Sequence, residues 1–377
     1  MQVVLFCHSL VSCWNHGNVH FLRGVVREFQ ARGHAVRVFE PEDGWSRRNL
    51  VREQGEAALE RNLRACPPNC VTTYTANTLD PDQALDGADL VLVHEWNEPA
   101  LIERLGRHRL ARGRYVLLFH DTHHRALTRP AEMARYRLEG YDGVLAFGTT
   151  VREIYLRQGW ARRAWTWHEA ADLRAFRPHP AARRDLDLVW IGNWGDDERA
   201  AELHAYLFDP IGELRLEAAV YGVRYPEGAL RWLRHRRIAF RGWLPNHQVP
   251  QAFAGARVTV HVPRQPYARA LPGIPTIRVF EALACGIPLV SAPWDDAEGL
   301  FTPGEDFLMA TDGASMRKAI AAVLHDPDMA ATLAARGRRT VEERHSCRHR
   351  VDELLAICAT LAPDRFASDL TPRSAVA

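Results

Sequence analysis

Short apolar runs and amphipathic segments alternate along the first part of the chain. Gln2 to Cys7 is a mainly apolar run, and a polar stretch follows it. A helical pattern of apolar positions then extends from about Val19 to Arg32 and ends at Gly33. Val36 to Phe39 is the next apolar run, which gives the order strand, loop, helix, strand. Units of this kind build doubly wound parallel sheets, so we predict an α/β fold.

Three further apolar runs in the first half have the length of buried strands: Asp89 to Val93, Tyr115 to Phe119 and Gly143 to Phe147. In doubly wound sheets, ligands bind beyond the carboxyl ends of the strands. The polar residues that follow each strand are therefore candidates for a functional site. After the first strand these residues are Asn15, His16, Gly17, Asn18 and His20.

Four residues near the predicted strand ends are candidates for acid–base chemistry. They are His20, Glu95, His120 and Asp121. A His beside an Asp can act as a general base near neutral pH, or can orient a sugar hydroxyl. Two alternatives are a purely structural role for each histidine, and a metal site whose ligands would be His120, Asp121, His123 and His124.

The most informative stretch lies in the second half and reads LPGIPTIRVFEALACGIPLVS, from Leu271 to Ser291. It begins with a Gly/Pro loop, continues as a helix from about Thr276 to Cys285, and ends at Gly286 before a short apolar strand. A helix N-terminus presents free N–H groups to a phosphate. Glu281, one turn into the helix, is an acceptor suited to a sugar hydroxyl. The combination indicates a nucleotide-sugar site.

Glu281 to Val290 matches the second half of the donor-binding signature of group 1 glycosyltransferases, which is E-x7-E closing on EAxAxGxPxV. The chain resembles this family, whose fold is GT-B, with two Rossmann-like doubly wound domains that face one another across a cleft. With Gly before RVFEALACG, it looks most like the branch related to spore-maturation glycosyltransferases.

The resemblance implies roles for the residues of this stretch. The second Glu of the signature, here Glu281, holds the nucleotide ribose. Amides at the helix start hold the diphosphate, and the register places them at Thr276, Ile277 and Arg278. The first Glu of the signature, which usually contacts the donor sugar, falls on Gly273.

The family pattern also places donor contacts after two earlier strands of the second half. Gly192 and Asn193 follow the apolar run Leu186 to Ile191, where the family usually has an Arg and then a Lys for phosphate. Since neither stands here, we expect the positive charge to come from Arg264, Arg269 and Arg278. We also expect a helix to open at Asp196 or Asp197. Gly242 and Trp243 follow the run Ile238 to Phe240, at the turn where the family reads the base edge.

Two domains are expected from the resemblance. Asp172, Phe176 and Pro178 match the D-x3-F-x-P crossing between GT-B domains. Residues 1–172 would form the N-terminal acceptor-binding domain and residues 186–349 the donor-binding domain. A C-terminal helix at about 350–363 would pack back on the first domain.

Composition limits the function classes. The formal net charge is +2, from 48 basic and 46 acidic residues, which gives no general argument for a nucleic-acid partner. No apolar run approaches the roughly 20 residues that span a bilayer. The start lacks a basic n-region and a cleavage site, and seven Cys in a long chain without a signal peptide favour a cytoplasmic location.

Two motifs of metal-binding type have simpler interpretations. Asp80-Pro81-Asp82 has the D-x-D spacing of metal-dependent GT-A glycosyltransferases, but it stands in a Pro turn before a short helix. We interpret it as a helix N-cap. Cys66 and Cys70 form a close pair, but no second pair stands at zinc-site spacing, so we do not predict a zinc site there.

The sequence thus predicts an enzyme that transfers a sugar from a nucleoside diphosphate sugar to an acceptor without a metal or bound cofactor. The nucleoside diphosphate sugar is a co-substrate. The base, the sugar, the acceptor, the stereochemical outcome and the oligomeric state are not specified. The alternatives are a sugar-nucleotide epimerase or hydrolase of the same fold, and a non-catalytic scaffold that binds a nucleotide.

Overall fold

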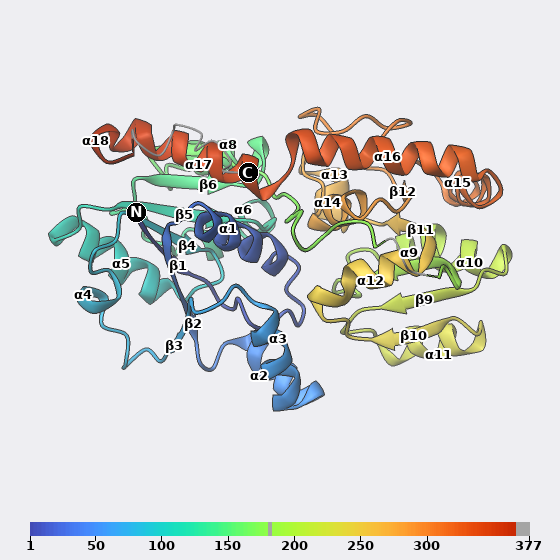
Figure 1. Ribbon diagram of the computed structural model, residues 1–377, viewed down its shortest axis with the longest axis horizontal. Helices are drawn as coiled ribbons and strands as arrows, with labels where there is room; N and C mark the ends of the chain where they lie inside the picture. Colours follow the sequence, from blue (N-terminus) through green and yellow to red (C-terminus); the bar gives the residue numbers. More distant parts are fainter. Residues whose placement is uncertain (180–182, 367–377) are drawn as a thin grey trace. The chain divides into compact units, whose positions relative to one another are not determined.

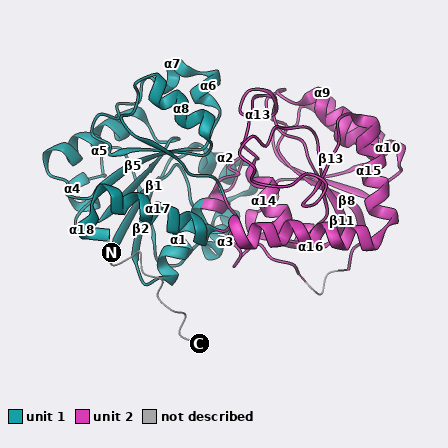
Figure 2. Cartoon of the chain, turned by 90° about the horizontal axis from the view of Figure 1, so that it is seen from above, with its two compact units in different colours: residues 1–12, 22–169, 347–377 teal, residues 13–21, 170–346 magenta. Residues whose placement is uncertain are grey.

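The computed structural model describes residues 1–179 and 183–366, and these residues form two compact units (Figure 2). Unit 1 contains Met1–Ser12, Leu22–Glu169 and the described residues from Cys347 onward. Unit 2 contains Cys13–Phe21 and Ala170–Ser346. Each unit is an α/β body with its own parallel sheet and its own buried core.

Unit 1 is built on a parallel sheet with strand order β3-β2-β1-β4-β5-β6-β7 in the described part of the chain (Figure 1). Its strands are β1 (Gln2–Phe6), β2 (Ala35–Pro41), β3 (Val71–Tyr74), β4 (Leu90–His94), β5 (Val116–Asp121), β6 (Gly143–Ala146) and β7 (Ala164–Thr166). Strands β1, β4 and β5 are buried on both faces, as their continuous apolar runs require. Because these parallel strands are neighbours, the residues that follow each of them lie at one common edge of the sheet.

Helices connect the strands of unit 1 and cover its sheet. They are α1 (Val19–Ala31), α2 (Trp45–Gln54), α3 (Glu56–Ala65), α4 (Pro81–Ala84), α5 (Pro99–Ala111), α6 (Arg125–Thr128), α7 (Pro130–Met133), α8 (Thr149–Arg157), α17 (Cys347–Leu361) and α18 (Pro363–Phe366). The first three residues of α1 are grouped with unit 2. The N-cap interpretation of Asp80 is confirmed, because its side chain accepts a hydrogen bond from the N–H of Asp82 at 3.0 Å.

Unit 2 is built on a second parallel sheet with order β10-β9-β8-β11-β12-β13 among the residues described. Its strands are β8 (Leu186–Ile191), β9 (Ala218–Tyr221), β10 (Ala239–Gly242), β11 (Ala256–His261), β12 (Leu289–Ser291) and β13 (Leu308–Met309). Its helical segments are α9 (Ala200–Leu203), η1 (His204–Phe208), α10 (Asp209–Glu213), α11 (Glu227–His235), η2 (Asn246–Gln248), α12 (Val249–Ala254), α13 (Gln265–Arg269), α14 (Ile277–Ala284), α15 (Gly313–His325) and α16 (Pro327–Arg344). The predicted α/β fold with two Rossmann-like sheets is confirmed.

Some elements differ from the sequence prediction. Strands β3, β7, β9 and β13 were not expected. Of these, β3, β7 and β13 are short and lie at the sheet edges, where the hydrophobic signal is weak. The helix expected to open at Asp196 or Asp197 begins only at Ala200. Its start is delayed because Gly195, Asp196 and Asp197 all have left-handed φ angles, of 88°, 53° and 64°.

The division of the chain also departs from the expected boundaries of 1–172 and 186–349. Residues 13–21, from the loop after β1, belong to unit 2 although they precede nearly all of unit 1 in sequence. The physical reason is a pair of hydrogen bonds that His20 and Asn15 of this segment make with Glu281 and Asn193. The crossing residue Asp172 also lies in unit 2, and α17 packs within unit 1.

Candidate functional site

A pocket of about 460 Å³ lies in unit 2 at the carboxyl ends of β8 and β9. Of the predicted donor residues, Gly192, Asn193, Trp243 and Arg278 line it. Residues that the donor prediction did not include also line it: Cys13, Asn15, His16 and Gly17 from the loop after β1, with Tyr221, Gly222, Leu244 and Asn246. The loop after β1, predicted to serve the first domain, therefore contributes to a unit 2 pocket.

Glycines allow the strand ends to meet at this pocket. A Cβ on Gly222, whose φ is 155°, would lie 2.1 Å from the carbonyl oxygen of Gly192. The N–H of Gly222 also donates to the carbonyl oxygen of Gly242 at 2.8 Å. The ends of β8, β9 and β10 thus pack backbone against backbone, which leaves backbone groups near any ligand in the pocket.

Glu281 is fully buried on α14 and accepts three side-chain hydrogen bonds. Its Oε1 is 2.9 Å from Nδ1 of His20 and 3.2 Å from Nδ2 of Asn246. Its Oε2 accepts from Nη1 of Arg278. Burial opposes ionisation, but the Arg278 charge and the His20 hydrogen bond outweigh it and hold the pKa of Glu281 below its usual value. The carboxylate is therefore ionised and fixed beside two residues, Asn246 and Arg278, that line the pocket.

The structure fixes the tautomer of His20. Its Nε2 accepts a hydrogen bond from the backbone N–H of Asp172 at 2.8 Å, so Nε2 carries no proton. The ring proton is then on Nδ1 and is donated to Glu281, while Phe176 stacks on the ring at 3.7 Å. The expectation that His20 lies apart from the donor residues is wrong. With both nitrogens engaged, His20 orients Glu281 rather than serving as a free base.

The start of α14 is where the sequence predicts it. Thr276 is the N-cap, and its hydroxyl lies 3.1 Å from Nε2 of His261. Ile277 is the first helical residue and packs close to the loop after β1, since a Cβ on Gly17 would lie 3.3 Å from its Cγ2. This places the N–H groups of the first helical turn beside the pocket that Gly17 and Arg278 line.

Three guanidinium groups near the pocket interact electrostatically. Arg199, which the sequence analysis missed, donates to the carbonyl oxygens of Val262 at 2.6 Å and of Asn193. Burial, together with the charges of Arg264 and Arg278, lowers the pKa of Arg199 to about 10. Clustered positive charge of this kind favours an anion. The signal for Arg199 was its place seven residues after Gly192, but its burial could not be read from the sequence.

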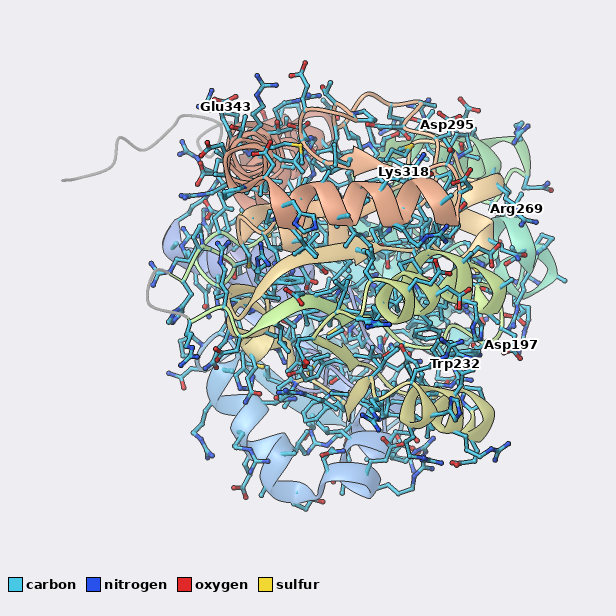
Figure 3. All side chains as sticks on the ribbon, turned by 90° about the vertical axis from the view of Figure 1, so that its right-hand side faces the viewer. Asp197, Trp232, Arg269, Asp295, Lys318 and Glu343 are labelled. Atoms are coloured by element: carbon cyan, nitrogen blue, oxygen red, sulfur yellow. The ribbon has the colours of Figure 1, made fainter. Side chains whose placement is uncertain are left out.

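The other two predicted arginines differ in their surroundings. Arg264 pairs with Glu198 at 2.5 Å and its side chain is 24% exposed. Arg269 pairs with Glu202 at 3.2 Å, is 69% exposed, and lies at the surface of unit 2 (Figure 3). Arg264 thus belongs to the charged cluster, while Arg269 has the environment of a solvated surface residue.

The acid–base candidates of unit 1 form a buried polar cluster at the end of β5. Glu95 accepts from the N–H of Thr122 at 3.0 Å and from Arg125 at 2.7 Å. Asp121 accepts from the N–H of His123 at 2.9 Å and from the hydroxyl of Tyr155 at 2.8 Å. Neither carboxylate is exposed to solvent. Their hydrogen bonds hold the loop after β5 against β4 and α8.

Burial sets the protonation of two of these candidates. Burial, reinforced by the charge of Glu95, raises the pKa of Asp121 well above its usual value. Burial alone lowers the pKa of His120 to about 3, and this ring packs edge-on against Trp167 at 4.8 Å. The sequence placed both residues after the strand, but they are its last two residues, inside the sheet. Burial thus favours the protonated form of Asp121 and keeps His120 neutral near pH 7.

The alternative of a metal site is not supported in the described ranges 1–179 and 183–366, where no group of three or more His, Cys, Asp or Glu side chains is arranged to hold a metal ion. Within the same residues, none of the helices combines the length and apolar character needed to cross a bilayer.

Comparison with known proteins shows which domain and which fold this chain resembles. Residues 199–356 match the model of a family described as glycosyl transferase-like. A sucrose-phosphate synthase from Thermosynechococcus elongatus has a TM-score of 0.66 at 17% identity, over 97% of this chain and 100% of its own. The chain thus has the GT-B fold, and its residues 199–356 resemble a glycosyl transferase-like domain. The predicted resemblance to GT-B glycosyltransferases is thus confirmed.

Two further solved structures share this GT-B fold. HepE from Anabaena, in complex with UDP and glucose, has a TM-score of 0.63 at 15% identity, over 95% of this chain and 100% of its own. An alpha-glucosyltransferase in complex with UDP and a 13-mer DNA has a TM-score of 0.68 at 11% identity, over 95% and 99%. A comparison with curated protein sequences gives no significant match. The narrower resemblance to the spore-maturation branch stays a prediction, as does the cytoplasmic location.

Proposed function

We propose that this GT-B protein transfers a sugar from a UDP-sugar to an acceptor, without a protein-bound metal or cofactor. The observation that carries the proposal is Glu281, an ionised and fully buried carboxylate whose partners Asn246 and Arg278 line the unit 2 pocket. A carboxylate so placed accepts hydrogen bonds from ribose hydroxyls. UDP is proposed as the nucleotide because HepE and the alpha-glucosyltransferase are both in complex with UDP.

The diphosphate would be held at the start of α14. Backbone N–H groups of Thr276, Ile277 and Arg278 supply donors, and the helix dipole favours negative charge there. The guanidinium groups of Arg199, Arg264 and Arg278 add the positive charge that a metal ion supplies in other enzymes. These groups stabilise the leaving diphosphate as its charge develops, which lowers the barrier to transfer.

Acceptor binding is proposed for unit 1, whose buried cluster of Glu95, His120 and Asp121 ends β4 and β5. Their geometry supports positioning roles, because the two carboxylates are fully hydrogen-bonded and His120 is too weak a base at neutral pH. The structure supports His20 in the same kind of role, on the donor side.

Titration calorimetry with UDP, ADP, GDP and CDP tests the proposal, followed by an assay of UDP release from UDP-glucose with and without saccharide acceptors. We expect selective UDP binding, and UDP release that acceptors accelerate. Conversion of the UDP-sugar to an isomer would instead identify an epimerase. Binding of UDP without turnover of any UDP-sugar would identify a non-catalytic scaffold, and no nucleotide binding would overturn the proposal.

Replacing Arg278 by alanine is expected to weaken UDP binding by about 1.5–3 kcal/mol, since a charge-assisted contact to the diphosphate is lost. Uridine, which has no phosphate, is expected to bind no more weakly, because Oε2 of Glu281 loses a competitor for the ribose. Arg269→Ala, which removes an exposed arginine of the same unit, is the matched control and should change neither affinity. Equal losses for UDP and uridine in Arg278→Ala would assign Arg278 to structure alone.

A further inference from the structure

Gly273, where the group 1 signature has its first glutamate, is closely approached by another acidic side chain. Gly273 lies in the loop before α14 and has a φ of +80°. A Cβ built on it would lie 2.4 Å from Cγ and 2.7 Å from Oε1 of Glu298. Two features therefore restrict position 273 to glycine. Its backbone is in the left-handed region, and the side chain of Glu298 leaves no room for a Cβ. The carboxylate of Glu298 occupies the space that a side chain at position 273 would fill.

The segment that carries Glu298 is anchored on both sides. The N–H of Gly273 donates to the carbonyl oxygen of Asp295 at 2.6 Å. The carboxylate of Asp296 accepts from the N–H groups of Leu300 at 3.0 Å and Phe301 at 2.7 Å. The side chains of Leu300 and Phe301 are buried. These contacts fix the backbone around Glu298 and hold its side chain against the loop before α14.

The position of this carboxylate has a chemical consequence. In a UDP-sugar, the sugar is bonded to the second phosphate, so the sugar adjoins the site that holds the diphosphate. Gly273 is three residues before the N-cap of α14, the helix whose start is proposed to bind that diphosphate. An ionised carboxylate can only accept hydrogen bonds, so it suits the hydroxyl groups of a sugar. It repels the carboxylate of a uronic acid, because the two groups have the same charge.

We propose that Glu298 binds hydroxyl groups of the transferred sugar and selects neutral sugars over uronic acids. The assignment rests on the proposed UDP-sugar function of the same unit. The assignment makes Glu298 a specificity-determining residue. Glu298 lies in the segment after β12, outside the group 1 signature.

The test compares the affinities of UDP, UDP-glucose and UDP-glucuronate by calorimetry, for the wild type and Glu298→Gln. The variant is expected to lose about tenfold or more in UDP-glucose affinity, since hydrogen bonds to a charged acceptor are lost, while UDP affinity stays unchanged. The wild-type preference for UDP-glucose over UDP-glucuronate should also narrow. Asp295→Asn is the matched control, because it removes a carboxylate from the same segment at an exposed surface position (Figure 3).

A second variant tests the geometry independently. Gly273→Ala places a methyl group where the Glu298 side chain lies, and should displace it and reproduce the selective loss of UDP-glucose affinity. Unchanged UDP-glucose affinity in Glu298→Gln, or equal losses for UDP and UDP-glucose, would overturn the assignment of Glu298 alone. Failure of the wild type to bind UDP would overturn the proposed function and this assignment with it.

Discussion

Replacing Glu281 by glutamine is expected to weaken UDP binding by about 1.5–3 kcal/mol, or roughly 10- to 150-fold, as large an effect on UDP affinity as that of Arg278→Ala. The two carboxylate oxygens receive hydrogen bonds from His20, Asn246 and Arg278. Glutamine has the same size but only one acceptor oxygen, so its NH₂ group must face a donor. Titration calorimetry with UDP measures the loss.

The matched control for this prediction is Glu305→Gln, which removes a carboxylate of unit 2 that is 60% exposed and pairs with Arg336 at 3.6 Å. It should leave UDP affinity unchanged. A folded Glu281→Gln protein that binds UDP as tightly as the wild type would contradict the central role of Glu281. Glutamine is a better probe than alanine, because it keeps the size of the side chain and one acceptor oxygen for the three donors.

The same substitution has a consequence for stability at acid pH. The folded protein holds the pKa of Glu281 below its ordinary value of 4.5. The carboxylate therefore contributes stability above that value, and the contribution is lost as pH falls through the folded pKa. Thermal unfolding of Glu281→Gln should show a smaller decrease in stability below pH 4.5 than the wild type.

The local structure of the predicted donor-binding stretch was largely readable from the sequence because its signals are local. The Gly/Pro loop, the helix start at Thr276 and the acceptor at Glu281 all fall within residues 271–281 of one loop–helix unit. Contacts between distant residues were not readable. His20 and Glu281 are 261 positions apart, and no pattern in either segment indicates that the loop after β1 would fold onto unit 2.

Burial was the second property that the sequence did not reveal. Arg199 reads as one of many arginines, yet it is partly buried and donates to backbone carbonyl oxygens next to the pocket. His120 and Asp121 read as residues after a strand, because polar residues usually end an apolar run. In the structure the hydrogen bonds of Asp121 to Tyr155 and His123 allow the strand to include both. Tertiary partners thus decide where a strand ends and how its acid–base groups titrate.

Replacing Asp121 by asparagine is expected to stabilise the protein near neutral pH, the largest gain in stability that we predict. The pKa of Asp121 is raised by burial and by Glu95, against the opposing effects of the His123 N–H, Tyr155 and Arg125. Above the ordinary pKa of 3.8, the unfolded chain loses this proton while the folded protein keeps it. The free energy of unfolding therefore falls by about 1.4 kcal/mol for each pH unit between about pH 4 and the folded pKa.

Asparagine resembles the protonated acid and does not titrate, so Asp121→Asn should remove this decrease above about pH 4. Urea unfolding of both proteins across that range measures it. Asp142→Asn is the control of opposite sign, because Asp142 accepts from the N–H of Leu117 at 2.8 Å and pairs with Arg109 at 3.3 Å, so its charge is favourable. Lower stability of Asp121→Asn at pH 7 would show that Asp121 is ionised in the folded protein. It would then be available as a base, and the same variant should lose about 10²–10⁴ in turnover.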